Sequence, residues 1–318
     1  LCKNCFGNNV DYGKIAFDID KMTEKNDWIA IVHIDGNGFG KITQNIENDE
    51  DKLKIFSSKL DDVTKEAAQF AFKELNLDLN KTIPVRPIIL GGDDLTIICR
   101  ADLAIKYTKV FMESFETKSK ASLKEGLEET GLEKLTTCAG IAFIKSSYPF
   151  YYGYDLAEEL CNQAKNDAKK HLVNGLAPSC LMFHKVQDSF VDNYETIVER
   201  ELTTLKGISF KYGPYYLSET KEHADKKTVT SLLDIAEKLE KDSEGNALKS
   251  HFREWISLLF TNPDRAKQAV DRMRVIFNKD ELINKVTDLS NKETPVYDIL
   301  SLQSVIYQET KDNNKENQ

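Results

Sequence analysis

The feature that most constrains the fold is a Gly-Gly-Asp-Asp sequence at residues 91–94, which lies between two short apolar runs. Residues 87–90 and 95–99 are both rich in β-branched side chains. Glycine adopts the positive φ angles of a tight hairpin turn, so the segment predicts a β-hairpin. Two adjacent carboxylates at its tip repel each other unless a cation lies there. For this motif alone, a divalent-metal site and a solvated acidic turn are both open.

A second acidic position follows a nearly continuous apolar run. Residues 28–34 have the length and composition of a strand that is buried on both faces. Asp35 comes directly after this run. Three glycines in five positions then follow, which predicts a loop that turns tightly or approaches a ligand closely.

The rest of the first two thirds alternates between helical and extended patterns. Helices are predicted at 48–75, 101–129 and 154–171, and further strands at 136–144 and 179–184. The order predicts an α+β fold with a ferredoxin-like βαββαβ palm, as in polymerases and nucleotide cyclases. In that topology the end of the first strand is next to the tip of the central hairpin. Asp35 is therefore expected to meet Asp93 and Asp94.

The apolar face of the predicted helix 48–75 and the core of the C-terminal region can both be read from the sequence. The helix face is Leu53, Phe56, Leu60, Val63, Ala67 and Phe70. Further helices are predicted at 229–241, 247–260 and 265–277, with a core of Leu232, Leu233, Ile235, Leu239, Trp255, Leu258 and Leu259. The predicted parts are a zinc-knuckle remnant and lead-in (1–27), the palm (28–190), a connector (191–226), a small helical bundle (227–308) and a disordered tail (309–318).

Composition limits the classes of partner. The chain of 318 residues has 43 Lys and Arg against 52 Asp and Glu, a net charge of −9. This argues against non-specific duplex binding by the whole surface, although a local basic groove stays open. No apolar run approaches the ~20 residues of a membrane span, and no signal peptide pattern is present. A cytoplasmic protein without membrane contact is expected.

The cysteines fall into two groups. Cys99, Cys138, Cys161 and Cys180 lie in apolar segments and are predicted to be core residues. Cys2 and Cys5 form a C-x-x-C knuckle, which is half of a zinc-ribbon signature, and no partner pair follows at ribbon spacing. Either the other half lies upstream in a longer chain, or the knuckle is a vestige. Zn²⁺ binding is expected only if the other half is present.

The ordered combination of motifs resembles one family. Residues 35–41 close a buried strand, and the Gly-Gly-Asp-Asp hairpin follows. This order resembles the palm of the large polymerase- and cyclase-like subunit of type III CRISPR effector complexes, the Cmr and Csm large-subunit family. Residues 138–143, Tyr148-Pro149, Ala157, Ala164-Lys165 and Phe183-His184 extend the likeness over roughly residues 28–187. The helical C-terminal part resembles the last domain of that subunit less distinctively.

The resemblance implies an enzyme that joins ATP into cyclic oligoadenylate or cyclic dinucleotide messengers in antiviral defence, using Mg²⁺ or Mn²⁺. Its expected partners are effector subunits with guide RNA and target RNA. Asp35, Asp93 and Asp94 would be the catalytic metal ligands, and Lys165 would contact the triphosphate. The other implied nucleotide-binding residues are Gly36, Asn37, Gly38, Phe39, Gly91 and Gly92.

The sequence departs from the family pattern in two ways, and two alternative functions stay open. The chain has no HD nuclease motif and no first palm, so it is expected to be a fragment of a two-palm subunit or a single-palm relative that pairs with a second copy. A non-catalytic palm scaffold is one alternative, although it has no use for three clustered carboxylates. A GGDEF-like diguanylate cyclase is the other, although the tip here is Gly-Gly-Asp-Asp-Leu rather than Gly-Gly-Glu-Glu-Phe.

Overall fold

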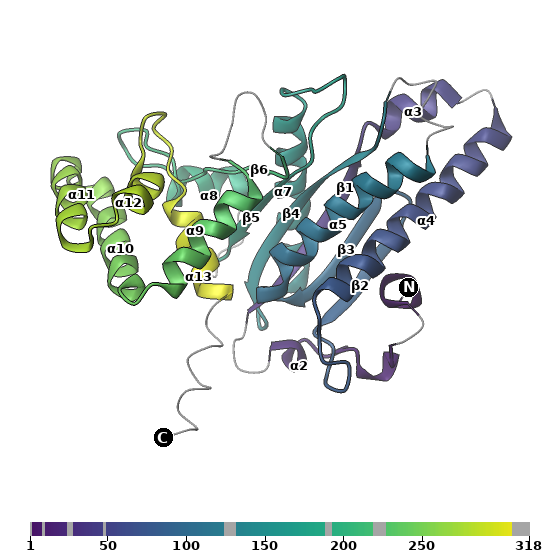
Figure 1. Cartoon of the computed structure of the whole chain (residues 1–318), viewed down its shortest axis with the longest axis horizontal. Helices are drawn as coiled ribbons and strands as arrows, with labels where there is room; N and C mark the ends of the chain where they lie inside the picture. The colour runs from purple at the N-terminus through teal and green to yellow at the C-terminus, as the bar shows by residue number, and fades with distance from the viewer. Residues whose placement is uncertain are drawn as a thin grey trace. The chain divides into compact units, whose positions relative to one another are not determined.

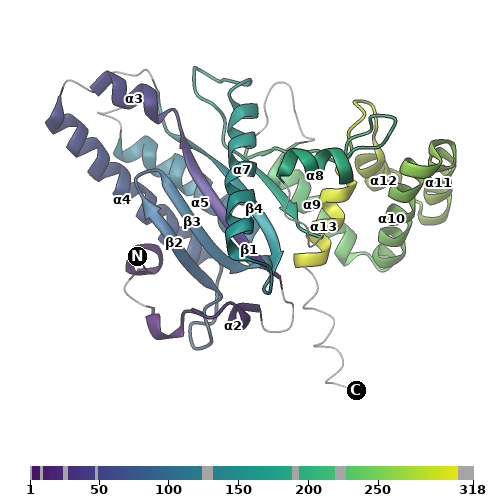
Figure 2. The same cartoon turned by 180° about the vertical axis from the view of Figure 1, so that it is seen from behind.

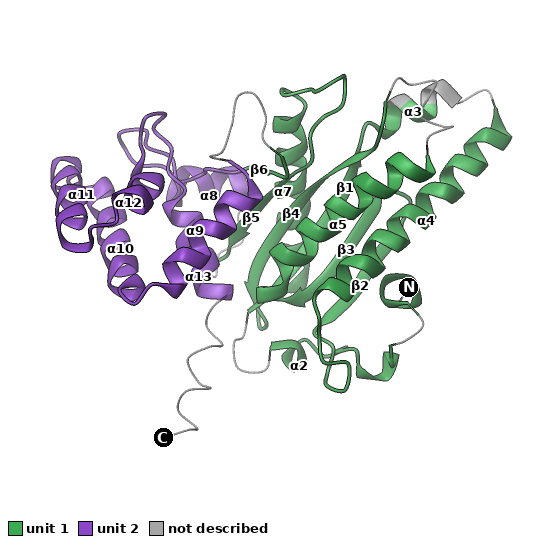
Figure 3. Cartoon of the chain, in the orientation of Figure 1, with its two compact units in different colours: residues 1–189, 214–220 green, residues 190–213, 221–318 purple. Residues whose placement is uncertain are grey.

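The computed structural model describes residues 2–7, 10–23, 28–46, 49–123, 132–187, 193–218 and 227–306. The chain divides into two compact units (Figure 3). Unit 1 comprises residues 1–189 and 214–220, and unit 2 comprises residues 190–213 and 221–318. The predicted tail and part of the predicted connector lie outside the described residues.

Unit 1 is built on one six-stranded sheet with the order β2-β3-β1-β4-β5-β6. The first four strands of this order pair antiparallel, which is the ferredoxin-like arrangement. The fifth strand is parallel to β4, and the sixth is antiparallel to β5. The predicted α+β fold class is confirmed. The strands are β1 (Trp28–Asn37), β2 (Val85–Gly91), β3 (Asp94–Arg100), β4 (Thr136–Lys145), β5 (Cys180–Lys185) and β6 (Tyr215–Tyr216).

Helices cover the two faces of this sheet unequally. Helices α4 (Glu50–Glu74) and α5 (Ala101–Ser122) lie side by side over one face (Figure 1). Helix α7 (Phe150–Ala168) crosses the opposite face over β1 and β4 (Figure 2). Each helix buries one apolar stripe, as amphipathic helices on a sheet do.

Local sequence signals fix several helix boundaries. Asp49 accepts a hydrogen bond from the backbone N–H of Lys52 at 3.0 Å, so it caps the N-terminus of α4. The helix predicted from residue 48 therefore begins at Glu50. Pro149 is the N-cap of α7, so this helix begins four residues before its predicted start. Phe70 was expected on the buried face of α4 but is 46% exposed.

The expected glycine loop after Asp35 is largely regular structure. Strand β1 continues through Gly36 and Asn37, because both residues pair with β4. The turn is confined to Gly38, whose φ is +84°, and helix α3 (Phe39–Ile46) begins at the next residue. The predicted tight turn is therefore present at Gly38, but the loop predicted for residues 36 and 37 was wrong, since both continue the strand pairing.

The N-terminal segment of unit 1 packs against α4 and the sheet. It contains α1 (Cys2–Phe6), a short 3-10 helix (Tyr12–Lys14) and α2 (Asp20–Thr23). The Phe6 ring lies 4.3 Å from the ring of Phe72 on α4. This contact buries Phe6 and joins α1 to the core of unit 1.

Unit 2 is helical and has its own core. Of the predicted core residues, Leu233 and Leu258 are half-buried, and the others are buried. Unit 2 also contains a buried lysine, Lys249. Its ammonium donates to Glu240 at 2.9 Å and to Gln303 at 3.1 Å. The helices are α8 (Tyr194–Glu201), α9 (Val229–Lys241), α10 (Gly245–Thr261), α11 (Pro263–Phe277), α12 (Asp280–Thr287) and α13 (Val296–Ile306).

In the parts of the chain that the structure describes, every helix is too short or too polar to cross a bilayer.

Candidate active site

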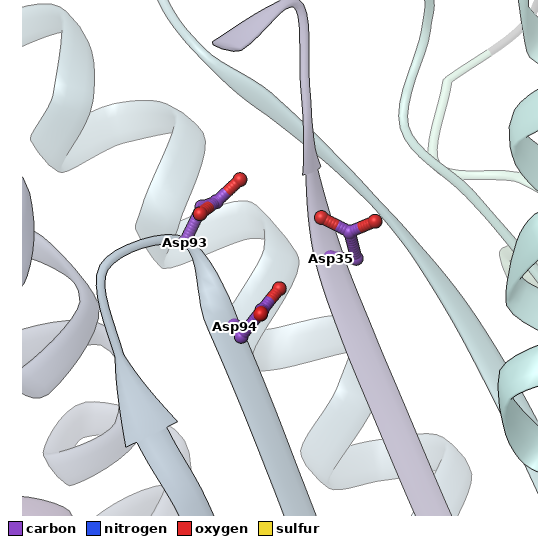
Figure 4. Close-up of side chains that lie close together, drawn as sticks. All are labelled: Asp35, Asp93 and Asp94. Carbon is purple, nitrogen blue, oxygen red and sulfur yellow. The ribbon is translucent and has the colours of Figure 1, made fainter. Parts of the chain in front are cut away.

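Three carboxylates meet at the end of the sheet where β1 meets the β2–β3 hairpin. The pairing of Ile34 with Leu95 brings Asp35, on β1, opposite the start of β3. One oxygen from each of Asp35, Asp93 and Asp94 lies within 4.8 Å of the others. Figure 4 shows the side chains converging on the space between hairpin and strand. We call these three residues the acidic triad, and the structure has the juxtaposition that the topology predicted.

Lys165 places a positive charge against this triad. It lies in the last turn of α7, and its ammonium forms an ion pair with the Asp35 carboxylate. The two side chains are only 18% and 27% exposed, so water screens the pair incompletely. Among the described residues, Lys165 is the one basic residue that forms an ion pair with the triad. Three carboxylates thus share a single positive charge.

The electrostatic state of the triad reflects crowding of like charges. Burial, the nearby carboxylates of Asp35 and Asp93, and a hydrogen bond with Asp35 raise the pKa of Asp94 to about 6. Burial also raises the pKa of Asp93, assisted by the charge of Asp35. Backbone N–H groups of Asp93 and Gly36 act in the opposite direction, as does Lys165. The site disfavours full ionisation until more positive charge arrives.

The donor set fits a divalent cation. Mg²⁺ and Mn²⁺ prefer hard oxygen ligands, and carboxylates together with water supply them. Across the described residues, the triad is the one group of three or more His, Cys, Asp or Glu side chains close enough to share an ion. Acids with raised pKa values, as Asp93 and Asp94 have, are common at functional sites.

Glycines at the site allow close approach and positive φ angles. A Cβ added to Gly36 would lie 2.7 Å from the Cβ of Asp93, so only glycine lets the hairpin tip come this near β1. Gly92 turns the hairpin with a φ of +60°. Added Cβ atoms at Gly91 and Gly92 would meet open space. A Cβ added to Gly38 would lie 3.9 Å from the Cδ1 of Leu176.

Two of the predicted nucleotide-binding residues have side chains that are engaged within the fold. The Asn37 amide donates to Thr136 Oγ1 at 3.1 Å and to Cys138 Sγ at 3.3 Å, and the residue is 3% exposed. The Phe39 ring lies 5.8 Å from the ring of Phe56 on α4. Any contact of Asn37 with a nucleotide would therefore involve its backbone. The roles of both residues stay predictions.

His33 was interpreted from the sequence as a core histidine with its polar atoms satisfied. Its Nδ1 lies 2.9 Å from Thr96 Oγ1, and its ring is 6.0 Å from that of Tyr154. Burial lowers its pKa. A neutral ring held in this way agrees with the sequence interpretation.

Sequence reasoning missed two residues that hold the site together. Thr64 on α4 donates its hydroxyl proton to the Gly92 carbonyl at 2.5 Å. Gly140 lets α7 approach β4, because a Cβ there would overlap the Ala157 carbonyl. An isolated glycine in an apolar strand is a signal for such an approach. A threonine within an apolar helix stripe is a weaker signal, since it usually bonds to its own helix.

Cys2 and Cys5 lie one turn apart on α1. Cys5 is 1% exposed, and burial raises the pKa of its thiol to about 12. Zinc binds the thiolate form, which this burial disfavours. Within the described residues, neither cysteine belongs to a group of three potential ligands. The zinc site stays a prediction that requires a second half-site.

The fold and the triad define a class of protein: a palm domain of the kind found in polymerases and nucleotide cyclases, with an acidic set at the hairpin tip. Residues 28–174 match the family model described as Cas10/Cmr2, second palm domain. This part of the chain is therefore similar to the second palm domain of Cas10/Cmr2, and the resemblance to the type III CRISPR large subunit is confirmed.

Solved structures of Csm1 have a similar fold. A Csm1-Csm4 cassette in complex with cA4 superimposes with a TM-score of 0.57 at 13% identity, and one in complex with pppApA with 0.55 at 14%. Csm1 in T. onnurineus gives 0.52 at 14%. Each match covers 91% of this chain, and the chain spans 38%, 37% and 39% of those proteins respectively. At these identities the likeness concerns the fold. No curated protein matches the chain.

Proposed function

We propose that this chain provides the catalytic palm of a metal-dependent nucleotidyltransferase that makes cyclic oligoadenylate messengers from ATP. The observation that carries the proposal is the acidic triad, with its three carboxylates within 4.8 Å and its single paired lysine. A palm that served only as a scaffold would gain nothing from crowded carboxylates, since these destabilise the fold unless a cation joins them.

The residues of the chain have separate tasks in this proposal. Asp35, Asp93 and Asp94 hold Mg²⁺ or Mn²⁺, which when bound lowers the pKa of a ribose hydroxyl and stabilises charge on the transferred phosphate. Lys165 is drawn from Asp35 toward the triphosphate, where its ammonium supplies a point charge. Phosphoryl transfer needs positioning and charge stabilisation, so no histidine base is required.

The choice of ATP and of cyclic products rests on the relatives. Solved cassettes with this fold are complexes with cA4 and pppApA. The family model that matches residues 28–174 is that of the Cas10/Cmr2 second palm domain. A diguanylate cyclase is less favoured because the tip carries Asp93-Asp94-Leu95 in place of two glutamates and a phenylalanine.

The partners are part of the proposal. The chain spans less than two fifths of the solved relatives, so a second palm is expected to complete the active site, either in the same protein or in another copy. Effector subunits with guide RNA and target RNA would control activity. Such assembly would take place in the cytoplasm.

The test is incubation of the chain with ATP or GTP and with Mg²⁺ or Mn²⁺, followed by mass spectrometry of the products. The matched control is the double variant Asp93→Ala/Asp94→Ala. Adenylate oligomers that the control does not make support the proposal, and guanylate products would support the diguanylate cyclase. A folded chain that binds ATP without product needs its second palm or its complex. A folded chain that binds no nucleotide would contradict the proposal and support the scaffold.

A further inference from the structure

The hairpin tip carries two of the three triad carboxylates and is open beside its two glycines. Asp94 makes its last ladder pair with Gly91, and Gly92 turns the chain with a positive φ. Added Cβ atoms at Gly91 or Gly92 would meet nothing within 4 Å, so the tip is open on the sides where those atoms would lie. The tip must nevertheless hold Asp93 and Asp94 against their mutual repulsion and that of Asp35.

A hydrogen bond from a different element reaches this tip. Thr64 lies on α4, is fully buried, and places its Oγ1 2.5 Å from the Gly92 carbonyl oxygen. The same hydroxyl lies 3.1 Å from the carbonyl of Leu60, the usual partner one turn back in its own helix. A hydroxyl has one proton to donate, and the shorter contact is the one to Gly92. The bond therefore joins α4 to the hairpin tip across 28 positions of sequence.

We propose that Thr64 is a positioning residue for the acidic triad. Its hydroxyl fixes the Gly92 carbonyl and thereby the orientation of the peptide that leads into Asp93. The proposal rests on the proposed function, in which the triad binds a divalent cation. A site whose ligands approach within a few ångströms depends on groups that orient those ligands, and loss of such a group typically weakens metal binding 10- to 100-fold.

The chain contains a matched control. Thr108 on α5 is also fully buried, and its hydroxyl donates to the Ala104 carbonyl of its own helix at 2.8 Å. Thr64→Val and Thr108→Val each exchange a buried hydroxyl for a methyl group of similar size. They share the general effect of that change, and only the first removes the bond to the hairpin. Thr64→Ser keeps a hydroxyl at the position.

The first readout is Mn²⁺ binding by the whole chain, measured from the loss of the free-ion electron paramagnetic resonance signal. We expect the Mn²⁺ affinity of Thr64→Val to fall about tenfold. Thr64→Ser and Thr108→Val should bind within about twofold of the wild type, because both keep the bond to Gly92. Equal affinity in Thr64→Val and the wild type would overturn the inference. If Thr64→Val does not fold, Thr64→Ala against Thr64→Ser makes the same comparison.

The second readout separates this inference from the proposed function. Amide hydrogen exchange of residues 90–95 reports the tip without any metal. We expect faster exchange there in Thr64→Val than in Thr108→Val, with rescue in Thr64→Ser. If the wild-type chain binds no Mn²⁺, the proposed function fails, and exchange still decides whether Thr64 holds the tip. Unchanged exchange in Thr64→Val would contradict that role.

Discussion

The two units contain the same kinds of charged group in opposite electrostatic states. In unit 2, Lys279 pairs with Asp242 and lies 3.5 Å from Glu244; we call these three residues the Lys279 cluster. A hydrogen bond from Lys279 lowers the pKa of Asp242, assisted by the backbone N–H of Glu244. In unit 1, the pKa values of Asp93 and Asp94 are raised although Lys165 lies nearby.

The difference teaches how a structural ion pair differs from the metal site that we propose. The Lys279 cluster has two acids on one lysine, and the hydrogen bond from Lys279 favours the ionised form of Asp242. The acidic triad has three acids on one lysine and is half-buried, so ionisation is opposed. Perturbed acids of this kind gather at functional sites, where a bound cation relieves the repulsion.

The largest expected effect is loss of metal binding on removal of a triad carboxylate. Asp93→Asn should weaken Mn²⁺ binding by more than about 100-fold, because a direct ligand matters more than the groups that orient it. Asp242→Asn is the matched change in the Lys279 cluster and should leave Mn²⁺ affinity unchanged. Titration monitored by electron paramagnetic resonance measures both. Equal losses in the two variants would remove the distinction between the clusters.

A smaller effect is expected from a methyl group at Gly36. The added Cβ would lie 2.7 Å from that of Asp93, so the hairpin tip must move away from β1. We expect Gly36→Ala to weaken Mn²⁺ binding on the order of 10-fold or more. Gly40→Ala is the control, because a Cβ there meets nothing within 4 Å. Wild-type affinity in Gly36→Ala would show that the close approach does not matter for the site.

The pH dependence of metal binding follows from the raised pKa of Asp94, about 6 in the metal-free state. Protons compete with the metal for this carboxylate, so affinity falls as pH decreases through 6. Between pH 7.5 and pH 5 the Mn²⁺ affinity should fall by about tenfold. Isothermal titration at the two pH values measures this. An affinity that stays constant down to pH 5 would mean that Asp94 is not a ligand.

Replacement of Lys165 should change the affinity for Mn²⁺ modestly and the affinity for ATP clearly. Its ammonium competes with a cation for Asp35, and a partly exposed pair contributes up to about 1 kcal/mol, a factor of about five. Lys165→Met should therefore strengthen Mn²⁺ binding by up to about fivefold while it weakens binding of ATP. Parallel titrations with Mn²⁺ alone and with Mn²⁺ and ATP measure the two effects. Weaker Mn²⁺ binding in this variant would argue against competition.

The smallest expected effect is a difference in the sign of stability changes. The folded pKa of Asp94 lies above its ordinary value, so this ionised group destabilises the metal-free protein at pH 7, and Asp94→Asn should raise the melting temperature. The pKa of Asp242 is lowered, so its charge stabilises above its unfolded pKa, and Asp242→Asn should lower it. Thermal unfolding without metal measures both shifts. Shifts of the same sign would contradict the comparison.

The sequence predicted the fold well because each strand of the core has a distinct signal. The apolar run before Asp35 and the hairpin glycines identify β1, β2 and β3, and the topology then brings Asp35 to Asp93. The loop predicted at residues 36 and 37 was wrong, because glycine is compatible with a loop and also with a strand that another backbone approaches. Only the pairing with β4 decides between the two.

The contacts that support the site could not be predicted from the sequence. The hydrogen bond from Thr64 to Gly92 depends on the position of α4 over the hairpin, which helical periodicity does not give. The inward orientation of Asn37 depends on the neighbouring strand, where Thr136 and Cys138 accept its protons. Such contacts come from tertiary packing, whereas sequence patterns report mainly the local structure.

The most direct test of the central claim is a crystal structure of the chain grown with Mn²⁺, using anomalous scattering to locate the metal. We expect an anomalous peak among the carboxylates of Asp35, Asp93 and Asp94, with the Lys165 ammonium no longer paired with Asp35. An Asp35–Lys165 ion pair that persists, with no peak at the acidic triad, would contradict the account.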